Sequence, residues 1–461
     1  LSTAPPDEFN LTQFCTELNY IRRSSRSMKV LSTHVDGILR LKFILDEDDK
    51  KRIDELNFGM DRGLEVFVDL GAEVDAIHPD LLGVISILIV NPFVGKVLIL
   101  PEPVSLDFHK MASSVISRYK IQQNWDSDLK SLHASKRRNH ALAFSGGADS
   151  VAALSVMPGS TIPIFLSRPN SEDSMYDSDA ALVICKELSD LGYDVKIVDS
   201  NLEMIRDPVG FPTDLANAVP ALLLSEALEI SSISFGTVLE SGYGIGHEKF
   251  VEYGKSAHFR FFGTLFSAVG VELSLPVIGI SEVGTAIICE NSPFGGYSQS
   301  CIRGTWLRPC MSCWKCFRKE LLLFSLGYRE EAGLISMLNS SEVQSKISSF
   351  PISHENVIVY SMQRIDLEEH QYLKPIVDKL DMSLDMEFLE RWYFESSKFI
   401  PDSLRHKTIR RILQYLEIMG PMDESFVRGW DMSEHLKSKR AKKGQARLTS
   451  YWQDFSARFV T

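Results

Sequence analysis

At 461 residues, the chain is too long for one compact hydrophobic core, so we expect two or three domains. Its net charge of -12 argues against a general coat for nucleic acid, although local basic patches remain compatible with that charge. The chain has no apolar run long enough to span a membrane, and its start, Leu1-Ser2-Thr3, lacks the parts of a signal peptide, so we expect a cytoplasmic protein without membrane contact.

The first part of the chain, residues 1–135, predicts an N-terminal α+β accessory domain. Two segments alternate between apolar and polar residues, which indicates strands, and two more apolar segments on either side of Asn91–Lys96 are expected to be buried strands. In chain order, the expected strands are Ile38–Leu45, Glu65–Leu70, Leu82–Val90 and Val97–Leu100, and a helix is expected over Leu106–Tyr119. This part carries no recognisable chemical signature.

The middle part, residues 136–330, alternates between short apolar strands and helices. The expected strands are Ala141–Phe144, Ile162–Leu166, Asp194–Val198, Ile233–Phe235 and Leu275–Ile280, and the expected helices open at Ser150–Leu154 or span Ala180–Leu191 and Asn217–Leu228. Such alternation predicts α/β architecture, with right-handed βαβ units and a parallel sheet covered on both faces. Ligands of these sheets bind beyond the carboxyl ends of the strands, so we expect the functional site there.

The last part, residues 331–461, predicts a helical C-terminal region with a basic tail. Helical spacing occurs over Leu334–Met337, Ile376–Leu389 and Ile409–Ile418. Six cations lie between Lys437 and Arg447, and Tyr451 and Trp452 follow them. A run of this kind is most often a solvated helix face. Docking of a protein partner, or of nucleic acid through phosphate contacts and base stacking, are the alternatives.

The heptapeptide FSGGADS lies between an expected strand and an expected helix. Its two glycines let the backbone turn sharply and approach a phosphate chain without an intervening Cβ, and N–H groups at a helix N-terminus attract anions. The hydroxyls can donate hydrogen bonds, and the carboxylate can hold Mg²⁺ or cap the helix. The alternative is a plain capped turn. The expected phosphate-binding residues are Ser145, Gly146, Gly147, Asp149 and Ser150.

Four of the seven cysteines form one cluster, with the spacing C-x8-C-x2-C-x2-C. Four thiolates at this spacing predict a structural Zn²⁺ site, and an iron–sulfur cluster or unliganded thiols are the alternatives. We expect Lys315, Arg318 and Lys319 to offset the negative charge of that site. The expected zinc ligands are Cys301, Cys310, Cys313 and Cys316, whereas Cys15, Cys185 and Cys289 sit among apolar neighbours and are expected in the core.

The string SGGxDS between an apolar strand and an Ala-rich helix resembles the PP-loop of ATP pyrophosphatases. This resemblance implies ATP with Mg²⁺ as cofactors and cleavage of ATP between the α- and β-phosphates. It implies that the catalytic residues are Ser145, Asp149 and Ser150. It also implies that Ile164–Ser167, with Phe165, forms a wall beside the adenine.

The PP-loop followed by the cysteine pattern resembles the 7-cyano-7-deazaguanine synthase (QueC) family. Three further segments are similar to that family: Gly210-Phe211-Pro212 before a helix, Gly236–Tyr243 after a strand, and the strand end Leu275–Ile278. The resemblance covers Asn139–Leu323 and is most specific at its two ends. It implies that a deazaguanine-like substrate is bound by Asn217, Thr237, Glu240, Gly242 and Tyr243.

Members of that family use ATP to adenylate 7-carboxy-7-deazaguanine, after which ammonia gives the amide and a second ATP drives dehydration to the nitrile. The resemblance therefore implies a ligase that forms a carbon–nitrogen bond through an acyl-adenylate. The chain departs from the family pattern at Ala148, at Ala216 and in the loop Gly279–Val283, where the family carries glutamine, arginine and lysine. The added domains are similar to those of QueC-like proteins in bacterial anti-phage islands, which implies a protein or nucleic-acid amine as an alternative acceptor.

Two other functional classes stay open. A non-enzymatic module that senses ATP or a deazaguanine would also retain the glycine-rich loop, and another adenylating PP-loop enzyme, such as a tRNA thiolase or an amide ligase, would share it. No cysteine stands in an obviously catalytic position to carry sulfur. His247 is either a general base for amine attack or an incidental loop residue.

Overall fold

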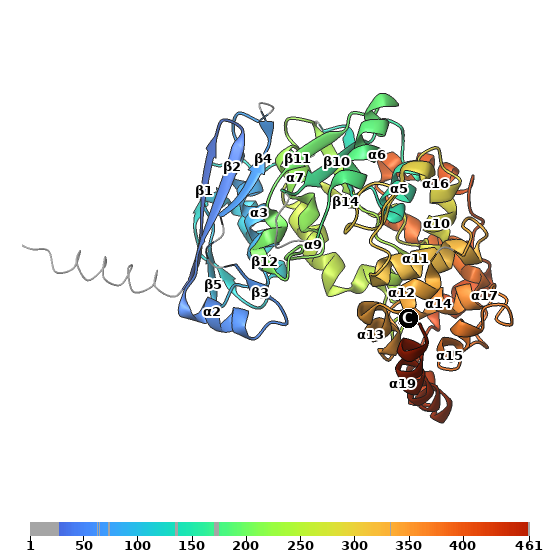
Figure 1. The fold of residues 1–461 in the computed structure, drawn as a ribbon. Helices are drawn as coiled ribbons and strands as arrows, with labels where there is room; N and C mark the ends of the chain where they lie inside the picture. The colour runs from blue at the N-terminus through green and yellow to red at the C-terminus, as the bar shows by residue number, and fades with distance from the viewer. Residues whose placement is uncertain are drawn as a thin grey trace, which may run out of the picture. The chain divides into compact units, whose positions relative to one another are not determined.

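The computed structural model describes residues 27–459 except 62, 64, 72–73, 134–136, 170–174 and 332, so Cys15 lies outside the described residues. The chain forms two compact units (Figure 1). The first contains the chain up to Ala134 together with 199–224 and 264–270, and the second contains 135–198, 225–263 and 271–461. Each unit has its own five-stranded sheet.

The first unit is built on a mixed sheet with the strand order β4-β2-β1-β5-β7. The pairs β1–β2 and β2–β4 are antiparallel, whereas β1–β5 and β5–β7 are parallel. Two small two-stranded pairs, β3–β12 and β6–β8, complete it. The strands are β1 (Met28–Val35), β2 (Ile38–Ile44), β3 (Gly59–Met60), β4 (Glu65–Asp69), β5 (Val97–Ile99), β6 (Val104–Ser105), β7 (Lys120–Ile121), β8 (Trp125–Asp126) and β12 (Arg206–Asp207).

The predicted strand Leu82–Val90 is wrong, because this segment belongs to the buried helix α3 (Pro79–Val90). His78 caps the helix, with Nδ1 accepting from the Asp80 N–H at 3.1 Å, and Pro79 occupies its first turn. Since α3 is buried all round, its sequence has no polar stripe to reveal the helical period. The other helices of this unit are α2 (Glu47–Asp54), α4 (Leu106–Val115) and α7 (Val219–Leu223).

The second unit has a parallel sheet with the order β11-β10-β9-β13-β14. Parallel pairing is found for β10–β9, β9–β13 and β13–β14. The expected α/β architecture with a parallel sheet and a helical C-terminal region is confirmed. The strands are β9 (Asn139–Phe144), β10 (Ile162–Ser167), β11 (Lys196–Asp199), β13 (Ile230–Ser234) and β14 (Glu272–Ser274).

Helices surround this sheet and form most of the C-terminal region (Figure 1). Both α10 and α16 pack on α5, and buried residues of these helices join β9 and β10 in one hydrophobic core that also includes Cys185 and Cys289. The helices are α5 (Ala148–Val156), α6 (Asp179–Asp190), α8 (Leu239–Tyr243), α10 (Glu282–Glu290), α11 (Trp314–Ser325), α12 (Leu334–Leu338), α13 (Ser341–Ser348), α14 (Glu355–Met362), α15 (Lys374–Val377), α16 (Asp402–Ile412), α17 (Pro421–Arg428), α18 (Ser433–Lys437) and α19 (Lys439–Phe459); α9 spans Ala257–Ser267.

Among the other predicted elements, four differ most from the structure. Leu275–Ile280 is a turn after β14, where Pro276 has no N–H for a sheet ladder. Of the predicted helix Asn217–Leu228, only a 3₁₀ turn and α7 form. Ile376–Leu389 contains the end of the short helix α15 and a separate 3₁₀ turn, and the helix expected over Ile409–Ile418 lies earlier, at α16.

Candidate functional site

The glycine-rich loop connects the carboxyl end of β9 to the N-terminus of α5. Gly146 has a φ of +73°, a left-handed conformation that favours glycine. The hydroxyls of the loop bind one another: Ser150 Oγ donates to the Gly147 carbonyl at 2.9 Å and lies 3.1 Å from Ser145 Oγ. The two serines therefore hold the turn in shape from within.

Backbone donors of this loop remain available. Within the described chain, the N–H groups of Gly146, Gly147 and Asp149 take part in no hydrogen bond, while Ala148 N donates to Ser300 Oγ at 3.2 Å. Gly147 is the N-cap of α5 and has no side chain to cover the helix end. The loop therefore presents free amide donors at the positive end of a helix, which is the arrangement that binds oxyanions.

A second glycine motif packs directly on the first. β13 lies next to β9 in the sheet, and the chain after β13 passes through Gly236. A Cβ added to Gly236 would lie 2.9 Å from the backbone of Asp149, so only glycine allows this approach. Because β10 and β13 lie on opposite sides of β9, the order of strands reverses here, and ligands of α/β sheets bind at such switch points.

Asp149 faces charged and polar partners from two later helices. Its Oδ1 accepts from Thr285 Oγ1 at 2.7 Å and from Lys319 Nζ at 3.2 Å. Lys319 also lies 2.7 Å from Glu282 Oε1, and Glu282 is bound by Arg318 as well. Arg318 and Lys319, which were expected to offset the charge of the cysteine cluster, thus have carboxylates near the loop as their direct partners.

Glu282 also forms a buried acidic pair with Glu240. Glu240 Oε2 accepts from the Glu282 N–H at 3.0 Å, and its Oε1 accepts from Asn356 Nδ2 at 2.8 Å. Burial and the nearby Glu282 charge raise the pKa of Glu240 to about 7. For Glu282, burial opposes ionisation, but Arg318, Lys319 and His354 together hold its pKa well below the usual range. The pKa values of the two carboxyl groups are thus shifted in opposite directions.

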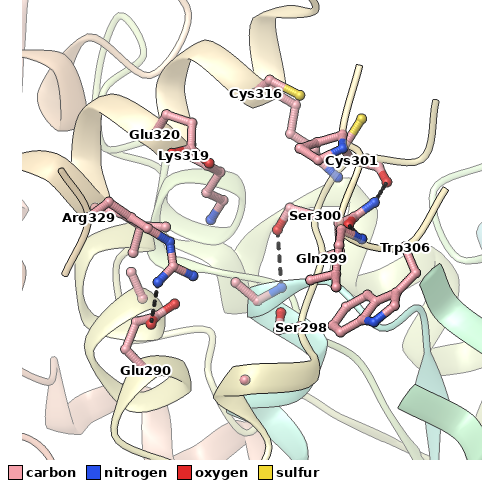
Figure 2. Close-up of a pocket in the computed structure, with 17 residues that line it drawn as sticks. Glu290, Ser298, Gln299, Ser300, Cys301, Trp306, Cys316, Lys319, Glu320 and Arg329 are labelled. Carbon is pink, nitrogen blue, oxygen red and sulfur yellow. Dashed lines mark hydrogen bonds and ion pairs between the residues drawn. The ribbon is translucent and has the colours of Figure 1, made fainter. Parts of the chain in front are cut away.

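A cavity of about 440 Å³ opens beside the loop (Figure 2). Its wall includes Ala148 of the loop, the segment Ser298–Cys301 and two lysines of α11, Lys315 and Lys319. Figure 2 shows Ser300 against the loop and Lys319 pointing toward it from the opposite wall. Glu290 and Arg329 form a 3.9 Å ion pair elsewhere in the lining. The cavity thus lies beside the end of the loop at Ala148 and carries two lysines, and its lining also includes the acidic residues Glu290 and Glu320.

The four predicted metal ligands come together. The Sγ atoms of Cys301, Cys310, Cys313 and Cys316 all lie within 4.8 Å of one another. A tetrahedral zinc site with Zn–S bonds of about 2.3 Å needs S···S separations of about 3.8 Å, and the Cys310–Cys316 and Cys313–Cys316 sulfurs lie 3.7 and 3.5 Å apart. The cluster could therefore hold one metal ion such as zinc.

Backbone donors and an acidic side chain support this cluster. Cys313 is the N-cap of α11, and its sulfur accepts from the Cys316 N–H at 3.4 Å. The cysteines lie on two segments, one arm around Cys301 and a second arm that begins α11. Glu342 joins these two arms, because it pairs with Arg303 at 2.5 Å and accepts from the Trp314 N–H at 3.1 Å. Such contacts orient the ligands of a metal and are typical of a built site.

The expected substrate residues are divided between the units. Thr237, Glu240, Gly242 and Tyr243 belong to the second unit, whereas Asn217 belongs to the first. Glu240 and Gly242 line another cavity, of about 400 Å³, together with His247. Phe165 is a buried member of the hydrophobic core, and Tyr243 is almost fully buried. Their binding roles stay predictions.

Sequence reasoning missed the side chains that meet the loop from a distance. Thr285, Ser300 and Lys319 lie more than 130 positions along the chain from their partners in the loop, with separations of 136, 152 and 170 residues. The only available signal was the position of Lys315 and Lys319 one helical turn apart after the CxxC step.

The basic tail begins at Lys437, the last residue of α18, and its other five cations lie on α19, whose inner side packs on the protein. Ala441, Leu448 and Trp452 are buried, Trp452 Nε1 donates to Ser348 Oγ at 3.1 Å, and Tyr451 Oη donates to the Tyr372 carbonyl at 3.2 Å. The two aromatic residues are therefore engaged within the fold, and stacking of nucleic-acid bases on them is not supported.

Comparisons with known proteins give one match. A family model described as a family of unknown function (DUF6395) matches residues 261–431, which is less than half of the chain. A search of curated proteins gave no match. In the part of the chain that the structure describes, no helix is both long and apolar enough to cross a membrane.

Proposed function

We propose that the chain is an ATP-dependent enzyme of the PP-loop class that adenylates a carboxylate and transfers the acyl group to an amine. The observation that carries the proposal is the pair of adjacent glycine motifs at the switch point, where Gly146 and Gly147 have free N–H groups and the next residue, Ala148, lines a cavity with Lys315 and Lys319 on its wall. Amide donors and lysines at one place fit a polyphosphate.

The proposed reaction is the one that the resemblance to the PP-loop class implies. A substrate carboxylate oxygen bonds to the α-phosphorus of ATP, the bond from that phosphorus to the bridging oxygen breaks, and pyrophosphate leaves with the electron pair. Lysines on the cavity wall would stabilise the leaving charge. The amine then attacks the acyl carbon, and AMP leaves as the amine proton passes to a base. Lys319 and a Mg²⁺ ion brought by the nucleotide would compete for the Asp149 carboxylate.

The cysteine cluster fits Zn²⁺ in a structural role. All four ligands would come from the protein, which leaves no position open for a substrate. Its two arms lead straight to the loop: Ser300, next to Cys301, accepts from the Ala148 N–H, and α11, which Cys313 caps, carries Lys319. We expect the metal to hold these two arms in position.

The resemblance to the QueC family supports a 7-carboxy-7-deazaguanine-type carboxylate as the substrate. It supports ammonia as the acceptor, or a macromolecular amine if the chain belongs to an anti-phage system. Lys319 supplies a cation at the loop in a chain that departs from the family's basic positions at Ala216 and in the loop Gly279–Val283. A catalytically reduced nucleotide sensor is the competing candidate, since the same loop would bind ATP without cleaving it.

Pyrophosphate release separates these candidates. Purified protein is incubated with ATP, Mg²⁺ and 7-carboxy-7-deazaguanine, with and without ammonia, and pyrophosphate and AMP are measured together with adducts by mass spectrometry. We expect carboxylate-dependent pyrophosphate release that Ser150→Ala lowers by about a hundredfold, while the exposed Asp190→Asn leaves it unchanged. ATP binding without pyrophosphate under any of these conditions would favour the sensor, and absence of ATP binding would overturn both.

A further inference from the structure

A cationic cavity lies at the other end of α5 from the glycine-rich loop. It has a volume of about 460 Å³ and is lined by the turn Pro158–Ser160, which follows α5, and by one face of α16. The residues of that face follow helical spacing and are Lys407, Arg410, Arg411 and Gln414. All of them belong to the second unit.

The three cations of this face are not neutralised by acidic side chains. Among the ion pairs of the described chain none includes Lys407, Arg410 or Arg411, although Arg405 on the same helix pairs with Asp402. Arg411 is fixed in place, because its guanidinium donates to the Met157 carbonyl at 2.6 Å, where α5 ends. Lys407 and Arg410 are exposed.

Three like charges within about one turn of helix repel one another, and this cost is removed when an anion binds between them. The Lys407 charge also acts on the sheet, since the pKa of His140 in β9 is lowered by burial and further by Lys407. The whole chain carries a net charge of -12, so an unpaired basic cluster differs from its general charge.

The opposite wall adds neutral donors. Gly159 and Ser160 are exposed, and a Cβ built on Gly159 would meet nothing within 4 Å, so a ligand can approach the backbone there. The Ser160 hydroxyl lies on the same turn. Amide and hydroxyl donors opposite guanidinium and ammonium groups form a chemical environment that suits phosphate oxygens.

We propose that this cavity is a second anion site, distinct from the glycine-rich loop, and that it binds a ligand with more than one phosphate group. Its volume exceeds the need of a single phosphate, and its cations are spread over Lys407 to Arg411. A free polyphosphate and the backbone of a single-stranded nucleic acid share this chemistry. The proposal is independent of adenylation, because no residue of the loop takes part.

The test uses the full chain, tripolyphosphate and a fluorescently labelled single-stranded oligonucleotide. Affinities are measured for the unmodified protein, for the double variant Lys407→Gln/Arg410→Gln, and for Lys186→Gln, whose lysine is exposed and pairs with Asp190 on α6. Arg411 is left intact because it also binds the end of α5. We expect at least one of the two ligands to bind about tenfold more weakly to the double variant, and the Lys186 variant to match the unmodified protein.

A local readout separates this cavity from the glycine-rich loop. Modification of Arg410 by phenylglyoxal, followed by mass spectrometry, is expected to slow when the bound ligand is present. Protection by tripolyphosphate identifies a free polyphosphate as the ligand, and protection by the oligonucleotide alone identifies a nucleic-acid backbone. Equal affinities for all three proteins, or an Arg410 that neither ligand protects, would overturn the proposal. Unchanged thermal unfolding of the double variant shows that any loss of binding is not loss of fold.

Discussion

Lys319 Nζ lies 3.2 Å from Asp149 Oδ1 and 2.7 Å from Glu282 Oε1, although Lys319 and Asp149 are 170 residues apart in the chain. This lysine joins the helix that begins at the cysteine cluster to the loop that begins α5. Since its side chain is only 8% exposed, water screens the two ion pairs weakly. The geometry of the loop therefore depends on a residue outside its own motif.

Replacement of Lys319 by methionine is expected to destabilise the protein. The change keeps a long side chain but removes the cation, so that Glu282 loses one of its buried partners. Removing one member of a buried ion pair costs about 3–5 kcal/mol. Urea unfolding followed by circular dichroism measures the free energy of unfolding. ATP binding, measured by calorimetry, is expected to weaken in the same variant.

The matched control is Lys186→Met, which removes a lysine from an exposed pair with Asp190. Surface pairs contribute about 0–1 kcal/mol, so we expect little change. Similar unfolding midpoints for the Lys319 and Lys186 variants would contradict the role of Lys319.

Glu240 makes stability depend on pH in a defined window. Burial and the Glu282 charge raise the pKa of its side chain from 4.5 to about 7. Between these pH values the folded protein holds a proton that the unfolded chain releases, so stability from this group falls as pH rises through the window and changes no further above it. The loss is on the order of 3 kcal/mol. Glu240→Gln removes this pH dependence. We therefore expect the variant to become more stable relative to the unmodified protein as the pH rises from 5 to 7.

This comparison separates Glu240 from its ionisable neighbours. Glu282 and His354 have shifted pKa values as well, lowered in both cases and near 4 for His354, but these two groups titrate in both proteins. The exposed Glu248→Gln serves as the control. Parallel curves of unfolding free energy against pH for the unmodified protein and the Glu240 variant would show that the buried carboxyl is ionised throughout.

The sequence was sufficient to predict those elements and sites that depend on a local pattern of residues. Alternation and turn residues predicted β9, β10 and β11 within two residues of their observed ends, whereas the last strand was expected at Leu275–Ile280 and lies at β14. The spacing of Cys301, Cys310, Cys313 and Cys316 predicted a cluster that the structure confirms. These features depend on neighbours within about 16 positions. A helix such as α3, buried on all sides, has no such pattern, because apolar residues occupy every face.

The partners of the loop could not be predicted because they are fixed by packing. Thr285 reaches Asp149 only because α10 lies against α5, and nothing in the local sequence of either helix specifies that contact. The same is true of Asn356, which binds Glu240 from α14. A single sequence gives residue types and spacing, whereas these hydrogen bonds depend on how separate helices pack.

Gly236→Ala is expected to disturb the loop without adding or removing charge. The new methyl group would lie 2.9 Å from the carbonyl carbon and oxygen of Asp149, and backbone atoms cannot move aside as a flexible side chain can. Overpacking of this kind costs about 1–3 kcal/mol. We expect weaker ATP binding and slower pyrophosphate release. In the control Gly254→Ala the nearest atom is a ring carbon of Phe399 at 3.4 Å, so the protein should be unaffected. Equal ATP affinity in both variants would place the nucleotide elsewhere.

Removal of the metal is expected to loosen both arms that meet the loop. Elemental analysis of the purified protein should find a single zinc ion per chain. A chelator that extracts this ion should both lower the unfolding free energy and weaken ATP binding, because Ser300 and Lys319 would lose their support. Cys313→Ala should reproduce this loss, whereas Cys185→Ala, at another buried cysteine, should retain the metal. Iron with acid-labile sulfide would identify a different cluster. Full ATP binding after complete metal removal would show that the four cysteines and the loop act independently.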